Sequence, residues 1–209
     1  MSFSEILRLP MRLIPAHKLL AAFMVLAIVM ATVYPSDLDR HRAANYAGHQ
    51  MPLIVFTEDY GRHLNSIAAL GTALVLRDLT GLKQLAVIIV VGIAATHGPK
   101  RLLNNVEVMG TRLGERPSRQ TSNHNMPSGH SALASAVIWF LGRRYSWWWL
   151  LLTVPVTLMT MLARVLLDAH TISAVIAGML VGLAFTMLFV TPCRRNEHQE
   201  RDEGRGKQT

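Results

Sequence analysis

The residues best suited to phosphate chemistry lie between positions 116 and 170. Arg116 and Arg164 carry planar guanidinium groups, each able to bind two phosphate oxygens at once. Ser128 directly precedes an apolar run, so we expect it to cap a helix whose first backbone N–H groups attract an anion. Gly129 permits a close backbone approach, and His130 can donate to a phosphate or to its leaving oxygen. Together these groups predict an anion site, provided that the fold brings them together.

A second histidine, His170, follows Arg164 after five intervening residues. Its neutral imidazole nitrogen can accept a phosphoryl group and form a covalent phosphohistidine. Asp168 stands just before the helix expected there, where it can orient the His170 ring or cap the helix. Simpler roles stay open for each group taken alone. The arginines can mark helix ends at the lipid headgroups, and the histidines can lie in the membrane interface.

The elements that must position these residues are helices in a membrane. The chain is 51% hydrophobic and 16% charged, with a mean hydropathy of +0.28, which is more apolar than a soluble domain of 209 residues. Runs free of Lys, Arg, Asp and Glu long enough for membrane helices cover 19–36, 84–99, 145–163 and 169–193. Two shorter runs cover 63–76 and 128–142. We predict an all-α polytopic membrane protein with about six transmembrane helices.

Three regions follow from this pattern. Residues 1–18 form a short amphipathic segment on the membrane surface, 19–193 the six-helix membrane domain, and 194–209 a disordered polar tail. A cleaved signal peptide is the alternative for 19–31, but no small-x-small cleavage site follows. Six helices put both termini on one side with the larger share of the 21 Lys and Arg residues, which predicts cytoplasmic termini. The phosphate-binding residues then lie on the outer side.

Other function classes find little support. The net charge of +8 is scattered between apolar runs without a basic aromatic face, so we expect no nucleic-acid partner. The single Cys193 allows neither an intramolecular disulfide nor a thiolate zinc site. No metal or other cofactor is implied, since arginines, an ammonium and a helix end supply the positive charge. Four further polar residues are expected to be solvated or to face lipid headgroups: Glu58, Asp59, His97 and His124.

The motifs resemble the type-2 phosphatidic acid phosphatase family, the membrane branch of a superfamily that includes bacterial acid phosphatases and vanadium haloperoxidases. The family pattern is Lys, six residues and Arg-Pro, then Pro-Ser-Gly-His, then Ser-Arg, five residues, His, three residues and Asp. The second part matches in full at 127–130, the first at Arg116 and Pro117, and the third at Arg164 and His170. The resemblance implies that His170 is the nucleophile, while His130 is the acid of the first step and activates water in the second.

The first departure from the family pattern is its lysine. Met109 stands seven positions before Arg116, where the family has Lys. Lys100 is the nearest lysine, with fifteen intervening residues instead of six. We expect either an insertion that leaves Lys100 in the site or a substitute cation from Arg101 or Arg112.

The second departure concerns the carboxylate that orients the nucleophile. Ala174 stands where the family has Asp, four residues after His170, and Ala163 replaces the family Ser. An orienting carboxylate fixes the tautomer of the imidazole and stabilises the charge it gains on attack. Ser173, Asp168, a backbone carbonyl or a carboxylate from another loop are the alternatives here.

The resemblance implies an integral membrane lipid phosphatase that removes a phosphate or pyrophosphate through a phosphohistidine. Family substrates include phosphatidate, phosphatidylglycerophosphate, undecaprenyl pyrophosphate and lipid A phosphate, which predicts a bacterial inner-membrane protein whose partners are membrane lipids. One alternative is a phosphotransferase that passes the phosphoryl group to another lipid. Another is a catalytically impaired protein that binds lipids or partners.

Overall fold

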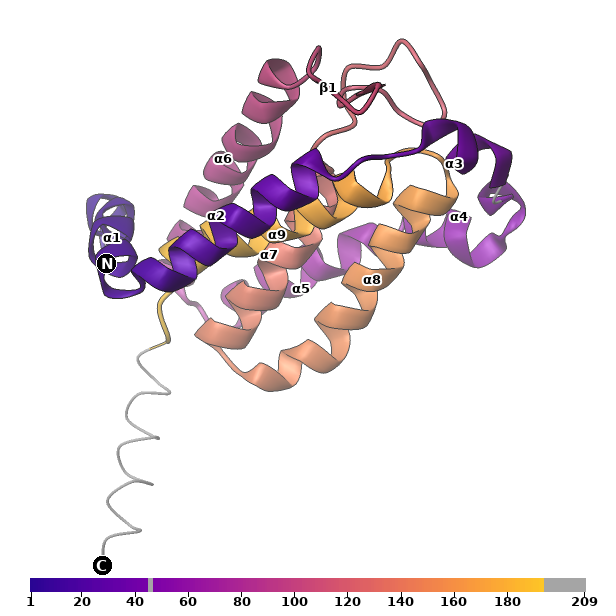
Figure 1. Cartoon of the computed structure of the whole chain (residues 1–209). Coiled ribbons are helices and arrows are strands. Elements are labelled where there is room, and N and C mark those ends of the chain that lie inside the picture. The colour runs from indigo at the N-terminus through magenta and orange to yellow at the C-terminus, as the bar shows by residue number, and fades with distance from the viewer. Residues whose placement is uncertain (45–46, 194–209) are drawn as a thin grey trace, which may run out of the picture.

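The computed structural model describes residues 1–44 and 47–193, which are mostly helical (Figure 1). The apolar runs become α2 (Lys18–Val33), α5 (Leu64–Val75), α6 (Leu79–Leu102), α7 (Gly129–Arg144), α8 (Leu150–Leu166) and α9 (Ile172–Phe189). The other helical elements are α1 (Phe3–Ala16), α3 (Leu38–Ala44), α4 (Pro52–Asp59) and the 3-10 turns η1 (Gly48–Gln50), η2 (Gly61–His63) and η3 (Trp147–Trp149). An antiparallel hairpin, β1 (Glu107–Val108) and β2 (Thr111–Arg112), lies between α6 and α7. The prediction of a mainly helical chain is confirmed, and the tail predicted at 194–209 lies outside the described residues.

Fewer of the described helices than predicted have the length and hydropathy of a membrane span. Three helical segments of the described residues are long and apolar enough to cross a membrane: Leu79–Leu102, Trp147–Leu166 and Ile172–Phe189. Helices α1 and α2 add a fourth if they are counted as one span, although they meet at 98°. Six spans are not confirmed, because α5 has only 12 residues and α7 only 16, against the roughly 20 that a bilayer needs.

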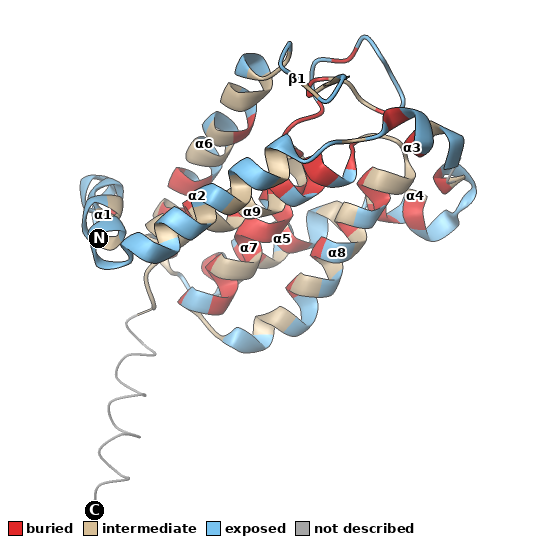
Figure 2. Cartoon of the chain, viewed as in Figure 1, coloured by how far each residue is buried: buried red, intermediate tan, exposed pale blue. Residues whose placement is uncertain are grey.

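Close packing of α7 against α9 forms the centre of the bundle, where the buried residues are concentrated (Figure 2). A Cβ at Gly178 would lie 2.2 Å from the backbone oxygen of Ser128, and one at Gly182 would lie 2.1 Å from that of Ala132. Glycine is therefore required at both positions, as is common where membrane helices touch. The contact fixes the start of α7 against the first turns of α9.

A buried ion pair joins α6 and α7 at the opposite end of the bundle. Asp78 caps α6 and accepts hydrogen bonds from the Arg144 guanidinium and from the Tyr145 hydroxyl, the latter at 2.9 Å. The side chain of Arg144 is only 3% exposed. Burial alone would raise the pKa of Asp78, but the hydrogen bonds from Arg144, the Gly81 N–H and Tyr145 lower it below its ordinary value. This pair therefore stabilises the charged form of Asp78.

Helix α1 is amphipathic and packs across α6 and α9. Ile6 is fully buried in that contact, whereas Phe3, Leu7, Met11 and Ile14 expose large apolar side chains. These four residues recur every three or four positions and so share one face of the helix. An exposed apolar face on a helix that bends sharply from the next one is what a helix lying on a membrane surface requires.

Candidate active site

Six of the residues singled out from the sequence line one cavity of about 510 Å³. They are Lys100, Arg116, Gly129, His130, Arg164 and His170. These residues come from the end of α6, the connection that follows it, the start of α7, the end of α8 and the turn before α9. Up-and-down helix connections bring all of these segments to the same end of the bundle (Figure 1). The rest of the cavity wall is largely apolar and includes Ile88, Ile89, Ile93, Leu133 and Phe185.

Ser128 caps α7 as the sequence predicted. Its hydroxyl accepts a hydrogen bond from the Ser131 N–H at 3.4 Å, and its own N–H donates to the Ala174 carbonyl at 2.9 Å. Ser128 is fully buried, so it shapes the helix start and does not itself line the cavity. Gly129 follows at the cavity wall, where a Cβ would lie 3.9 Å from Lys100 Nζ. The positive end of α7 and the Lys100 ammonium thus face the same space.

The three alternatives for the missing family lysine have different surroundings. Lys100 lies in the last turn of α6 and lines the cavity, close enough to Arg116 and Arg164 for electrostatic repulsion. Arg112 donates to five oxygens of the connection between α6 and α7, which occupies its guanidinium. Arg101 is exposed. The geometry therefore favours Lys100, and the extra residues before Arg116 form the β1–β2 hairpin.

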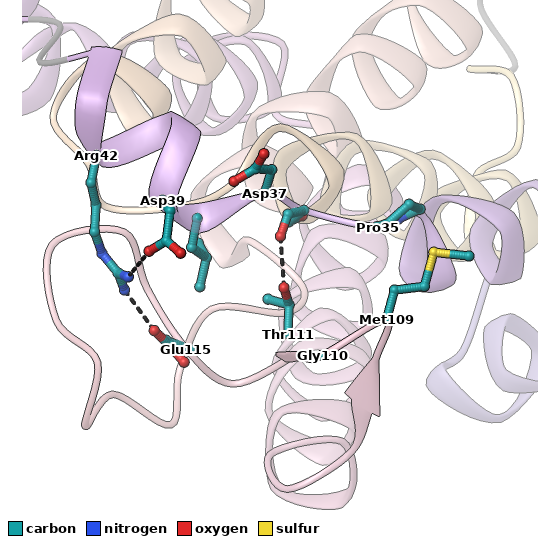
Figure 3. A pocket seen from close by; sticks show the side chains of 10 residues that line it. Pro35, Asp37, Asp39, Arg42, Met109, Gly110, Thr111 and Glu115 are labelled. Carbon is teal, nitrogen blue, oxygen red and sulfur yellow. Dashed lines mark hydrogen bonds and ion pairs between the residues drawn. The ribbon is translucent and has the colours of Figure 1, made fainter.

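Arg116 is positioned by a residue that the sequence analysis missed. Arg42 of α3 donates to the Glu115 carboxylate at 2.6 Å (Figure 3). It also donates to the Pro117 carbonyl at 3.1 Å, so it holds both neighbours of Arg116. Arg116 donates to the His124 carbonyl at 3.2 Å, and its buried Nε has no partner among the described residues. No local sequence signal links Arg42 to Arg116, because they lie 74 positions apart.

Figure 3 also shows a second cavity, of about 460 Å³, beside this Arg42 contact. Its lining residues come from the α2–α3 connection, α3 and the β1–β2 hairpin, and they include the polar side chains of Asp37, Asp39 and Thr111. It contains none of the residues predicted to do chemistry. Its wall includes the Arg42–Glu115 ion pair, which holds the residue next to Arg116 of the main cavity.

His170 is held by Asn125. The His170 Nδ1 lies 2.8 Å from the Asn125 backbone oxygen and 3.3 Å from its Oδ1, so Nδ1 carries the proton and donates. Asn125 is itself fixed by Thr171, whose N–H donates to Oδ1 at 3.1 Å. His170 is 1% exposed, and burial, followed by repulsion from Arg164, lowers its pKa well below the ordinary value. Its Nε2 is left unprotonated on a residue that lines the cavity.

Asp168, one of the alternatives for orienting His170, contacts a different histidine. Its carboxylate pairs with His41 Nε2 at 2.9 Å, and Asp168 does not line the main cavity. Ala174 is fully buried, and its carbonyl is used by the N–H of Ser128. We therefore assign the orienting contact to Asn125 in place of Asp168, which corresponds to the backbone-carbonyl alternative.

Glu58 contacts Arg164, a residue of the cavity wall, and is not simply solvated. Its Oε1 accepts a hydrogen bond from Arg164 Nη1 and another from Arg62 Nη1 at 2.7 Å. The same Arg62 nitrogen lies 3.3 Å from His130 Nε2. The Glu58 side chain is 20% exposed, so the expectation that it faces water or headgroups is wrong. Its position on α4, remote in sequence from the three motifs, gave no indication of this role.

Comparison with known proteins identifies the family. A model of the PAP2 superfamily matches residues 81–197, more than half of the chain. The chain belongs to the PAP2 superfamily. The match begins in α6, so it includes every cavity residue predicted from the sequence but leaves out Glu58 and Arg62 of α4 and η2.

Curated relatives of this PAP2 chain are phosphatases. A lipid A 1-phosphatase of Helicobacter pylori strain J99 / ATCC 700824 is 39% identical over 183 residues, which cover 86% of this chain and 90% of that protein. The lipid A 1-phosphatase of strain ATCC 700392 / 26695 is 45% identical over 66% of this chain and 71% of its own length. A lipid A 4'-phosphatase of strain J99 / ATCC 700824 is 33% identical over 57% of this chain and 61% of its own length. No solved structure gives a significant match.

The family and these relatives establish the type of enzyme. The chain is a membrane phosphatase of the PAP2 superfamily, and its relatives are lipid phosphatases. They support the enzyme over the catalytically impaired alternative. Within the described residues, no group of three or more His, Cys, Asp or Glu side chains is arranged to hold a metal ion.

Proposed function

We propose that this PAP2 enzyme removes the 1-phosphate of a lipid A-type lipid by hydrolysis through a phosphohistidine on His170. The observation that carries the proposal is the pair of buried Nε–H groups of Arg116 and Arg164, which have no partner among the described residues. Both arginines line the same cavity as His130 and His170. Buried donors without partners are costly, and phosphate oxygens are the acceptors that guanidinium groups fit best.

The charge of the cavity suits a phosphate monoester. Lys100, Arg116 and Arg164 each contribute a positive charge, and the start of α7 adds the partial charge of its free N–H groups. A phosphate monoester carries up to two negative charges on its non-bridging oxygens, and further negative charge develops on the leaving oxygen as its bond to phosphorus breaks. These fixed cations would stabilise that transition state without a metal ion.

The proposed reaction has two steps. In the first, His170 Nε2 attacks phosphorus, the bond from phosphorus to the lipid oxygen breaks, and His130 gives that oxygen a proton. In the second, His130 takes a proton from water, the water oxygen attacks phosphorus, and the bond to His170 breaks to release inorganic phosphate. Burial and Arg164 lower the pKa of His170, so its Nε2 lone pair is available at neutral pH. Its Nδ1–H bond to Asn125 supports the positive charge that the ring gains on attack.

The apolar part of the cavity supports a lipid as the substrate. Its apolar wall comes from α6, α7 and α9, and these side chains adjoin the cationic end. A lipid could thus place its phosphate among the arginines while its acyl chains remain against apolar surface. The names and coverage of the relatives favour lipid A, and the 1-phosphate over the 4'-phosphate, because the two 1-phosphatases match more closely.

The same proposal includes a placement in the cell. Residues 19–193 form the membrane phosphatase domain of a bacterial inner-membrane protein, with its active site on the periplasmic side and both termini cytoplasmic. Helix α1 would then lie along the cytoplasmic surface, on its exposed face of Phe3, Leu7, Met11 and Ile14.

A phosphate-release screen in detergent tests the function. Purified protein with EDTA would be assayed against lipid A bisphosphate, phosphatidate, phosphatidylglycerophosphate and undecaprenyl pyrophosphate. Mass spectrometry of the lipid A product would show which phosphate has left. We expect free phosphate and loss at position 1. Preference for another lipid refutes the substrate, and a phosphorylated acceptor lipid in place of free phosphate establishes the phosphotransferase.

A further inference from the structure

We propose that Arg62 is an additional phosphate-binding residue of the active site and is held in place by Glu58. When substrate binds, Arg62 gives up its hydrogen bond to His130 and donates to a phosphate oxygen instead. This inference rests on the proposed phosphatase function. It adds a cation from the α4–η2 segment, outside both the three sequence motifs and the region matched by the family.

The contacts place Arg62 at the reacting end of His130. Arg62 Nη1 lies 3.3 Å from His130 Nε2 and 2.7 Å from Glu58 Oε1. An oxygen about 3 Å from both Nη1 and Nε2 would close a triangle of ordinary hydrogen-bond lengths. A phosphate oxygen at that position would be within reach of both His130, which lines the cavity, and Arg62, which is not itself a lining residue.

The chemistry of the contact requires an exchange. An arginine can only donate, so in this arrangement Nε2 of His130 must be the acceptor and carry no proton. As the acid of the first step, His130 needs a proton on the nitrogen that faces the leaving oxygen. When the phosphate accepts from Arg62, Nε2 is released and can take a proton from solvent. Arg62 thus blocks the acid form of His130 until an anion is bound.

Glu58 couples this cation to the rest of the site. Its Oε1 accepts from both Arg62 and Arg164, so one carboxylate oxygen sets the separation of two guanidinium groups. Glu58 Oε2 is buried and has no hydrogen-bond partner among the described residues. The carboxylate therefore contacts both arginines through Oε1 alone. Without Arg62, the full charge of Glu58 would face Arg164 and weaken its attraction for phosphate. Glu58 is accordingly a positioning residue, and Arg62 a binding residue.

Kinetics of Arg62→Gln and Arg62→Lys test the proposal. We expect Arg62→Gln to raise KM and the inhibition constant for inorganic phosphate by about tenfold or more, because a charged contact to phosphate is lost. Arg62→Lys retains the charge and should fall between wild type and Arg62→Gln. The matched control is Arg40→Gln, which removes an exposed positive charge from α3 and should leave both constants unchanged.

Glu58→Gln separates positioning from binding. We expect its kcat to fall more than its KM rises, since Arg164 loses its fixed partner while the cations remain. Asp59→Asn, at an exposed neighbouring residue, is the control and should match wild type. Wild-type values of KM and of phosphate inhibition in Arg62→Gln would overturn the proposal.

The melting temperature in detergent, measured with and without inorganic phosphate, tests phosphate binding independently of lipid hydrolysis. Inorganic phosphate should raise the melting temperature of wild type, with a clearly smaller rise for Arg62→Gln. If wild type hydrolyses none of the lipids but shows this difference, the proposed function fails while phosphate binding by Arg62 stands. Equal stabilisation of both proteins by phosphate refutes the role of Arg62.

Discussion

Replacing Lys100 with Met removes the ammonium group that the structure places beside the start of α7. The Lys100 Nζ lies 3.9 Å from where a Gly129 Cβ would be, so no side chain separates it from the helix N-terminus. Methionine has a similar length and an apolar tip, and it fits a cavity whose wall is otherwise largely apolar. We therefore expect the substitution to affect charge more than packing.

The expected loss follows from the bond that is removed. A hydrogen bond to a charged group contributes about 1.5 to 3 kcal/mol. If it forms with the transferring phosphate, Lys100→Met should lower kcat/KM by roughly 10- to 150-fold. The adjacent Arg101→Met is the matched control, because Arg101 occupies the same helical turn but is exposed. It should stay within about twofold of wild type, well below the loss of any charged bond.

The measurement is phosphate release from the preferred lipid at saturating and subsaturating concentrations. A Lys100→Met enzyme with wild-type kcat/KM would refute the reasoning that an insertion leaves the family lysine at position 100. Equal damage from Arg101→Met would also refute it, because a general charge effect would then explain the loss.

Four other substitutions test separate parts of the structure. His170→Ala should abolish turnover, and brief labelling followed by an alkaline quench should leave acid-labile phosphate on wild type only; equal labelling of both proteins would contradict the nucleophile assignment. Asp168→Asn should retain most of kcat while Asn125→Ala lowers it about tenfold or more, since Asn125 fixes the loop at His170 through bonds of about 1 kcal/mol each; the reverse order would restore Asp168 as the orienting group. Asp78→Asn should destabilise the protein at pH 7 by about 3 to 5 kcal/mol, because it leaves Arg144 buried without its charged partner. The hydrogen bonds from Arg144 lower the folded-state pKa of Asp78, so its stabilisation is present above about pH 4 and is lost as the pH falls below that value. The gap in melting temperature between Asp78→Asn and wild type should therefore narrow in acid, and a gap that stays constant would contradict this.

Local patterns in the sequence were sufficient to predict the helices and much of the cavity. Each long apolar run became a helix, because backbone hydrogen bonds must be satisfied within an apolar segment whatever surrounds it. Ser128 caps α7 through contacts made within one helical turn. The spacing from Arg164 to His170 is likewise short enough for the chain itself to keep them near each other.

Six membrane spans were predicted from the apolar runs, whereas three of the described helices, or four with α1 and α2 counted as one, have the length and hydropathy of a span. Hydrophobicity alone does not distinguish a helix that faces lipid from one that faces other helices. Helix α7 is short, and much of its surface is buried by α8 and α9, with glycines at the closest contacts. An apolar run buried by other helices has the same hydropathy pattern as a run that faces lipid.

Contacts between distant segments decided the remaining features of the site. The sequence by itself predicted the phosphate chemistry, through Arg116, His130, Arg164 and His170 and their order along the chain. Only the tertiary structure placed Glu58 at Arg164, across 106 positions, because side-chain meetings between helices depend on crossing geometry that no local spacing encodes. The oxygen that His170 Nδ1 contacts at 2.8 Å belongs to the backbone of Asn125. Every residue has such an oxygen, so residue type could not predict this contact.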